Sequence, residues 1–203
     1  MTALQIIGAG GHGKVVADVA EACGYDPIEF IDPHWPERLN NGRWQITAAD
    51  VTLRETDLFC AVGSNSTRAK LFIKYGLTDS PTLTHPSAIL SPSAQIGAGS
   101  VVMPGVIANA DTQIGCGVIL NTGCSIDHDC VLDDFVHISP GARLAGNVKI
   151  GHGSWIGIGA VIREGVRVGR NVIVAAGAAV INDIPDNSRV GGVPAQPLSI
   201  RNI

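Results

Sequence analysis

An apolar residue returns at every sixth position between Leu90 and Val180, and this period constrains the fold more than any other feature of the sequence. Helices repeat apolar residues near every 3.6 positions and strands every second position, so a period of six fits neither. Hexapeptide repeats build a parallel β-helix, in which each hexad supplies one short strand and one corner. Three hexads close a triangular coil. We therefore expect about five coils over residues 89–181 and one inward column made of Leu90, Ala108, Ile126, Leu144, Ile162 and Val180.

The composition agrees with such a fold and excludes one class of function. The chain has 25 glycines and only 4% aromatic residues, so its core must consist mainly of small aliphatic side chains in a regular backbone. The formal net charge of −4 and the pI near 5.8 argue against a nucleic-acid-binding protein, whose surface would be basic.

The cysteines and the apolar segments indicate a soluble protein of the cytoplasm. The five cysteines are odd in number, form no CxxC pair and follow no signal-peptide pattern at the N-terminus, which favours a reducing compartment. The longest apolar stretch covers residues 172–181, well short of the roughly 18 residues that a membrane span needs.

The first 82 residues predict a small Rossmann-like α/β domain. Strand patterns over residues 4–7, 28–31 and 58–62 alternate with helix patterns over 15–22 and 67–75, which is typical of a parallel sheet. We therefore divide the chain into an α/β domain, residues 1–82, and a β-helix domain with a C-terminal tail, residues 83–203.

The turn after the first strand predicts a diphosphate-binding site. Gly8, Gly10 and Gly13 match the dinucleotide fingerprint, and Asp32 follows the second strand at the distance expected of a ribose ligand. A nucleotide sugar satisfies this pattern as well as NAD does, and a tight turn without ligand is a further reading. Because 80 residues are too few for two mononucleotide-binding halves, we favour the nucleotide sugar. Asn65 and Arg68 follow the next strand and are additional candidate contacts.

His128 is the candidate general base. A base with a pKa near 7 is needed when an amine or hydroxyl attacks a thioester, and His128 has a carboxylate on either side, Asp127 and Asp129. The alternative is a solvated corner histidine. His137 is a candidate cofactor contact or a surface residue. Gly146 lies one predicted coil after His128, where a residue without a side chain leaves room for a thioester and its amide can hold an oxyanion.

Charge is segregated along the predicted β-helix. Residues 111–134 hold five aspartates and no cation, which suits an amino substrate. Residues 143–170 hold five cations and one acid, which suits the phosphates of coenzyme A; ordinary solvated corners are the alternative for each. Arg163, Arg167 and Arg170 are the candidate cofactor ligands among them. We expect no metal site, because the histidines and aspartates lack a recurring ligand geometry.

Several motifs together resemble the hexapeptide-repeat sugar O/N-acyltransferases of the sialic-acid acetyltransferase and bacillosamine-pathway type. They are the glycine-rich segment 8–19, the strand that ends at Asp32, the Gly63-Ser64-Asn65 turn, the His128-Asp129 pair and the segment 191–195. The resemblance covers nearly the whole chain. It implies a left-handed β-helix, a homotrimer with active sites between subunits, and acetyl-CoA as the cosubstrate.

The resemblance also implies roles for individual residues. A UDP-sugar would be bound by the glycine-rich turn and the aspartate after the second strand, which are Gly10, Gly11, His12, Gly13, Lys14 and Asp32. His128 would be the general base and Asp129 its partner, one methylene shorter than the glutamate that many members carry. His137 would contact acetyl-CoA, and the segment with Gly192 and Pro194 would close over the pantetheine arm.

The implied reaction is acetyl transfer to the 4-amino group of a UDP-4-amino-4,6-dideoxy-N-acetylhexosamine of the bacillosamine type. O-acetylation of sialic acid and N-acetylation of GDP-perosamine are alternatives with the same base and cosubstrate. A non-catalytic scaffold that binds a nucleotide sugar is a different class of function, and an NAD-dependent oxidoreductase is a third.

Overall fold

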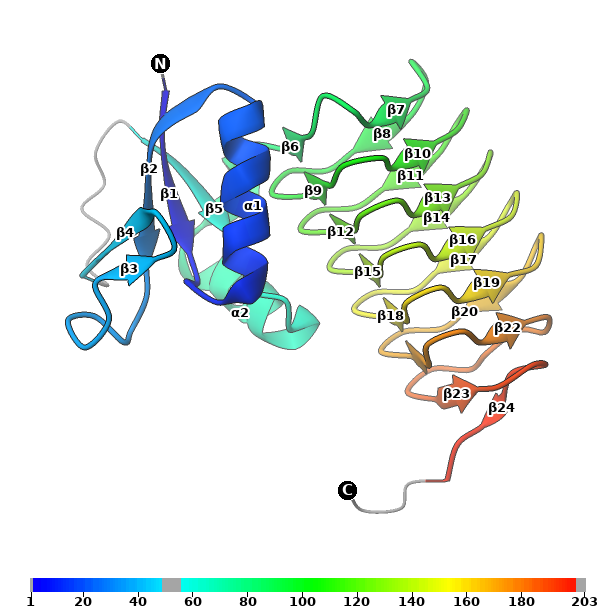
Figure 1. The fold of residues 1–203 in the computed structure, drawn as a ribbon. Helices are drawn as coiled ribbons and strands as arrows, with labels where there is room; N and C mark the ends of the chain where they lie inside the picture. The colour runs from blue at the N-terminus through cyan, green and yellow to red at the C-terminus, as the bar shows by residue number, and fades with distance from the viewer. Residues whose placement is uncertain (1, 49–55, 200–203) are drawn as a thin grey trace.

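A computed structural model describes residues 2–48 and 56–199 of the chain, which form a small α/β domain followed by a parallel β-helix (Figure 1). This is the predicted fold class. Neither of the described α-helices is long and apolar enough to cross a membrane. All five cysteines are unpaired.

The α/β domain contains one five-stranded sheet in the order β3-β4-β2-β1-β5. Strands β1 (Thr2–Ile7), β2 (Tyr25–Ile31), β4 (Trp44–Thr47) and β5 (Asp57–Cys60) run parallel, and β3 (Asn40–Asn41) pairs antiparallel with β4 at the edge. The three strands expected from the sequence are confirmed. The edge strands β3 and β4 were not predicted, because only Trp44 and Ile46 mark a buried face there.

Two α-helices accompany this sheet. Helix α1 (Gly11–Ala22) begins inside the glycine-rich segment, earlier than its apolar pattern indicates, and buries the face that carries Val16, Ala17 and Ala20. Helix α2 (Asn65–Lys74) is capped by Ser64, whose side chain accepts a hydrogen bond from the Thr67 amide at 3.4 Å. A 3₁₀ turn (Leu77–Asp79) then leads to the β-helix.

The β-helix has three sheets that share its coils, and parallel partners lie 18 residues apart, as Ile126 with Leu144. The predicted column from Leu90 to Val180 is confirmed by its strand register. In Figure 1 the chain crosses from β9 to β10 on the near side and returns through β11 on the far side as the coils descend, so the helix is left-handed. The strands are β6 (Leu83–Thr84), β7 (Ile89–Leu90), β8 (Gln95–Ile96), β9 (Val101–Val102), β10 (Ile107–Ala108), β11 (Gln113–Ile114), β12 (Ile119–Leu120), β13 (Ser125–Ile126), β14 (Val131–Leu132), β15 (His137–Ile138), β16 (Arg143–Leu144), β17 (Lys149–Ile150), β18 (Trp155–Ile156), β19 (Val161–Ile162), β20 (Arg167–Val168), β21 (Ile173–Val174), β22 (Ala179–Val180), β23 (Arg189–Gly191) and β24 (Gln196–Pro197).

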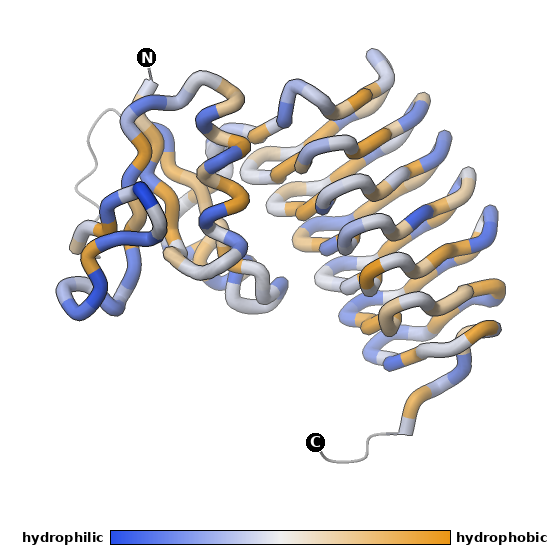
Figure 2. The backbone as a smooth tube through the Cα atoms, viewed as in Figure 1, coloured by the Kyte–Doolittle hydropathy of each residue, from blue (hydrophilic) through white to orange (hydrophobic). Residues whose placement is uncertain are grey.

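One apolar core runs through both domains. The buried cluster joins residues of the α/β sheet, such as Phe30, to inward residues of the coils, such as Ile138, and Figure 2 shows apolar residues returning on successive coils. Cys124 and Cys130 are part of this core, as predicted. The α/β domain packs beside the sheet that contains β6, β9, β12 and β15, so its position on the β-helix is fixed by packing as well as by the chain connection.

The core predicts a large effect of truncating one coil. Ile138→Ala removes a fully buried side chain from the middle of the β-helix and should lower the free energy of unfolding by about 2–5 kcal/mol. Ile73→Ala is the matched control, because Ile73 is 80% exposed and the change there should cost less than about 0.5 kcal/mol. Denaturant unfolding of the two variants measures the difference, and equal midpoints would contradict the assignment of Ile138 to the core.

Candidate active site

His128 and Asp129 form a hydrogen-bonded pair at the corner between β13 and β14. The imidazole Nδ1–H donates to Asp129 Oδ2 at 2.7 Å, because a carboxylate can only accept, and this leaves Nε2 with a free lone pair. Both side chains are more than half exposed. The hydrogen bond to Asp129 raises the pKa of His128, and the nearby carboxylates add to this shift. The pair therefore has the arrangement of a base and its orienting acid.

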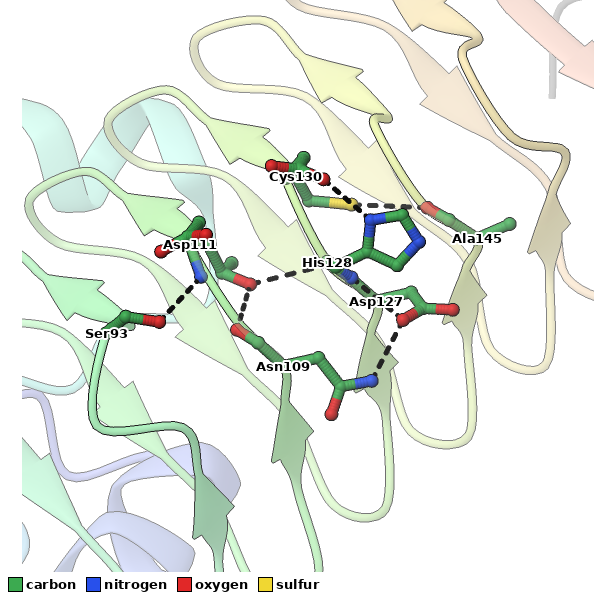
Figure 3. A network of polar contacts seen from close by, with 9 residues as sticks. Ser93, Asn109, Asp111, Asp127, His128, Cys130 and Ala145 are labelled. Carbon is green, nitrogen blue, oxygen red and sulfur yellow. Dashed lines mark hydrogen bonds and ion pairs between the residues drawn. The ribbon is translucent and has the colours of Figure 1, made fainter.

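A second carboxylate fixes the backbone of the same corner. Asp127 Oδ1 accepts hydrogen bonds from the His128 amide at 2.8 Å and from Asn109 Nδ2 at 2.9 Å (Figure 3). Sequence reasoning missed Asn109. It lies one coil before Asp127, so the repeat register could have revealed it.

Gly146 lies against the His128 ring, where the sequence register predicted it. A Cβ atom built on Gly146 would be 2.6 Å from both Cε1 and Nε2 of the imidazole, so only glycine leaves the ring its present position. Among the described residues, no acceptor receives the Gly146 N–H. That amide is available to a ligand beside Nε2.

A second group of side chains lies where the α/β domain meets the β-helix. The His12 and His137 rings are 6.4 Å apart between centroids, and His137 stacks on Trp155 at 5.7 Å. Asn121 Nδ2 donates to His137 Nε2 at 3.1 Å, and its Oδ1 accepts from the Thr122 amide, which fixes the orientation of the amide group. Sequence reasoning missed Asn121 and Trp155.

Both histidines of this group are held neutral. Burial, followed by the charge of Arg68, lowers the pKa of His12 to about 4. The same two causes, with His12 as a third, lower the pKa of His137 to about 3. Near neutral pH these imidazoles therefore act as hydrogen-bonding groups and not as cations.

The glycine-rich turn presents an open helix N-terminus. A Cβ atom on Gly10 or Gly11 would meet nothing within 4 Å, whereas one on Gly13 would lie 2.3 Å from the Gly8 carbonyl oxygen. The first two glycines thus leave space in front of α1, and Gly13 allows the helix to pack on the turn. No side chain caps Gly10. The free amides of α1 can bind an anionic group such as a diphosphate. Lys14 follows in the first turn with an exposed side chain.

Asp32 lies beside this turn and supports it. Its Oδ2 accepts from the Ala9 amide at 2.8 Å, and its Oδ1 accepts from the His34 amide and the His34 Nδ1–H. Burial alone would raise the pKa of Asp32, but these hydrogen bonds lower it overall. Arg38, which sequence reasoning missed, donates to the Ala9 carbonyl at 2.7 Å and to Asn41.

Arg68 and Asn65 lie in the interface between the domains. Arg68 is 1% exposed, and each of its five N–H groups has an acceptor in the chain, so none remains for a substrate. The expected substrate contact is therefore replaced by a link within the chain. Asn65 is half-buried beside a cleft of about 720 Å³ that Ser64, Lys70 and Trp155 also line.

The remaining candidates lie along later coils with exposed side chains. Arg163 occupies the same corner as Asp127 two coils later, roughly 10 Å along the axis. Arg170 borders a groove of about 590 Å³ together with Asp133 and Asp134. Arg167 lies on β20, and Gly192 and Pro194 lie between β23 and β24. Across the described residues, no group of three His, Cys, Asp or Glu side chains is arranged to hold a metal ion.

The two groups of functional side chains lie on different sides of one chain. Figure 1 shows the α/β domain beside the sheet of β12 and β15, whereas the corner between β13 and β14, which carries His128, points away from that domain. Within one chain, His128 therefore does not face the glycine-rich turn.

Comparison with known proteins connects these features. Residues 3–75 match the PglD N-terminal domain family, and residues 147–182 match the bacterial transferase hexapeptide family. UDP-N-acetylbacillosamine N-acetyltransferase of Bacillus subtilis is 38% identical over 112 residues, which are 51% of this chain and 52% of that protein. The match thus spans about half the length of the curated relative.

Solved structures match the chain over nearly its whole length. The acetyltransferase domain of PglB from Neisseria gonorrhoeae is 43% identical with a TM-score of 0.92, covering 98% of this chain and 100% of that chain. The same domain has been solved with acetyl coenzyme A, at a TM-score of 0.91 over 96% and 98% of the two chains. PerB from Caulobacter crescentus, solved with CoA and GDP-perosamine, is 38% identical with a TM-score of 0.90 over 98% of each chain.

Proposed function

Because the chain belongs to the hexapeptide-repeat sugar acyltransferase family with a PglD-type N-terminal domain, we propose that it transfers an acetyl group from acetyl-CoA to the amine of a nucleotide-linked amino sugar. The finer proposal for the acceptor is the 4-amino group of a UDP-4-amino-4,6-dideoxy-N-acetylhexosamine, as the name of the Bacillus relative suggests. The observation that carries the proposal is the His128–Asp129 pair with Gly146 against the imidazole.

The geometry supports direct transfer. The amine attacks the thioester carbonyl carbon while His128 Nε2 takes its proton, and Asp129 stabilises the imidazolium that forms. The Gly146 N–H, or a neighbouring amide, holds the developing oxyanion. As the tetrahedral intermediate collapses, the carbon–sulfur bond breaks, the amide remains on the sugar and CoA leaves. No covalent acyl-enzyme is needed.

The two ligands are assigned to different surfaces. The open amides of α1, with Gly10, Gly11, His12, Gly13 and Lys14, hold the nucleotide diphosphate, and Asp32 supports the turn that presents them. Acetyl-CoA lies along the later coils, in contact with the residues that leave room for it or offer charge to its phosphates, which are His137, Gly146, Arg163, Arg167, Arg170, Gly192 and Pro194.

A complete site needs a second copy of the chain. The base and the glycine-rich turn lie on different sides of one chain, so the nucleotide sugar bound by one copy meets His128 of another. This supports a homotrimer with active sites between subunits. We place the enzyme in the cytoplasm, where acetyl-CoA is available.

The base predicts a pH dependence. His128 must be neutral to accept a proton, so kcat/KM should rise with pH through a pKa that Asp129 holds above the usual value of about 6.5. Asp129→Asn removes this stabilisation of the charged ring and should move the midpoint to lower pH, whereas Asp129→Glu keeps the charge and should leave it near that of the wild type. A pH profile of kcat/KM for the three proteins checks this, and identical midpoints would refute the pairing.

Release of CoA thiol tests the substrate class. Wild-type protein is mixed with acetyl-CoA and, separately, with UDP-linked and GDP-linked 4-amino sugars and with sialic acid. Turnover with a UDP-linked amino sugar is the expected result. A preference for GDP-perosamine would change the nucleotide and keep the chemistry, turnover with sialic acid alone would replace the amine by a hydroxyl, and silence with every acceptor would favour a binding scaffold.

A further inference from the structure

Arg68 is the largest fully buried side chain of the protein's described residues, and it carries a charge. Its Nε–H donates to the Gly117 carbonyl at 2.7 Å, and its terminal nitrogens donate to the carbonyls of Val62, Gly63 and Phe135 and to Asn65 Oδ1. All five N–H groups of the guanidinium are thus satisfied. A lysine offers three donors from one atom and cannot reproduce this fan of bonds.

The acceptors of Arg68 belong to both domains. Val62 and Gly63 directly follow β5, at the carboxyl edge of the α/β sheet. Gly117 and Phe135 occupy the same corner on two successive coils of the β-helix, since they are 18 positions apart. The guanidinium therefore joins the edge of one domain to the corner of the other.

Asn65 extends this link to a third coil. Its Oδ1 accepts from Arg68, and its Nδ2 donates to the carbonyls of Gly153 and Ser154 at 3.0 and 3.2 Å. Gly153 is 18 positions beyond Phe135 and so lies at the same corner. The first turns of α2 are therefore bonded to three successive coils, which fixes the height of the α/β domain along the β-helix axis.

The corner is shaped to receive the helix. Gly117, Phe135 and Gly153 all have positive φ, and a Cβ atom on Gly117 would lie 2.6 Å from the Phe135 ring. That ring packs edge-on against Phe72 of α2 at 5.3 Å. Apolar packing and the Arg68 bonds thus hold the same contact.

This link lies behind the surface that would bind the nucleotide sugar. Val62, whose carbonyl Arg68 holds, is in close contact with Gly8 at the start of the glycine-rich turn. The His12 ring beyond that turn faces His137 on the β-helix at 6.4 Å. Burial lowers the pKa of Arg68 to about 10, so the group remains a cation near neutral pH, and its charge is one reason why both histidines are neutral.

We propose that Arg68 is a positioning residue for acyl transfer: by bonding the carboxyl edge of the α/β sheet to the corner carbonyls of the β-helix, it sets where the bound sugar lies relative to the acetyl group. The inference rests on the proposed function. It differs from a substrate contact because no N–H of Arg68 points to a ligand, so Arg68 acts through the turn and helix that it holds.

Arg68→Lys tests this inference, because lysine keeps the charge and loses the geometry. With the full-length protein, kcat/KM for the amino sugar that the wild type accepts should fall by about tenfold or more, while the KM for acetyl-CoA should stay within about twofold. Adding guanidinium to Arg68→Ala should restore part of the lost rate by filling the vacated site. Lys74→Ala, an exposed cation on the same helix, is the matched control and should behave as wild type.

The outcomes separate positioning from folding and from charge. A purely structural role would lower the active fraction and leave both KM values and the guanidinium response unchanged, which would overturn the inference. Wild-type kinetics for Arg68→Lys would also overturn it, because charge alone would then suffice. If the variants of Arg68 fail to fold, Asn65→Ala removes only the bonds to the third coil and should show the same split with a smaller size; no split there counts against the inference. Absence of transfer by the wild type would instead refute the proposed function.

Discussion

Replacing His128 by alanine should lower kcat by about 10²- to 10⁴-fold, because the variant lacks the group that takes the proton from the attacking amine. The side chain is exposed at a corner and carries no packing, so the fold should be unaffected. Steady-state thiol release gives the rate, and binding of acetyl-CoA measured by calorimetry shows whether the site is otherwise intact.

The matched control is His85→Ala, which removes another exposed histidine of the β-helix and should leave kcat unchanged. His128→Asn is a useful second variant, because it keeps a polar side chain of similar size but supplies no base. If His128→Ala keeps more than about a tenth of the wild-type rate, another group is the base and the assignment fails.

Gly146→Ala should lower kcat by roughly 10²-fold. The added methyl group would lie 2.6 Å from Nε2 of His128, so the ring must turn away from the position in which Asp129 holds it. A displacement of about 1 Å at a reacting group costs a loss of this order. The φ of Gly146 is not in the left-handed region, so alanine fits the backbone there and the unfolding midpoint should change little.

A double variant separates this effect from a loss of the oxyanion site. Alanine keeps the backbone N–H, so Gly146→Ala acts through the imidazole alone, and Gly146→Ala combined with His128→Ala should be no slower than His128→Ala. An additive loss in the double variant would show that Gly146 contributes separately from the ring.

The repeat made much of the β-helix predictable. Because inward residues return every six positions and coils every 18, the strand register of the column from Leu90 to Val180 followed from counting, and so did the place of Gly146 beside His128. The glycine-rich turn before α1 was predictable for a different reason, since Gly13 packs where no other side chain fits.

The contacts between the domains were not predictable in this way. Arg68 reads as an exposed cation on an amphipathic helix, and its burial depends on how α2 docks against corners that lie 49 and 67 positions further along the chain. The approach of His12 to His137 depends on the same docking. Arg38 and Asn41 escaped notice because the segment after β2 carries no periodic pattern, although it supports the glycine-rich turn.

The most direct test of the account follows the acetyl group itself. The protein is incubated with acetyl-CoA labelled in the acetyl group and a UDP-4-amino-4,6-dideoxy-N-acetylhexosamine, and the sugar is then isolated and treated with mild alkali. We predict that the label moves to the sugar with one CoA thiol released per acetyl group, and that it resists alkali as an amide does. Label that alkali removes as an ester, or label that stays entirely on CoA, would contradict transfer to the amine.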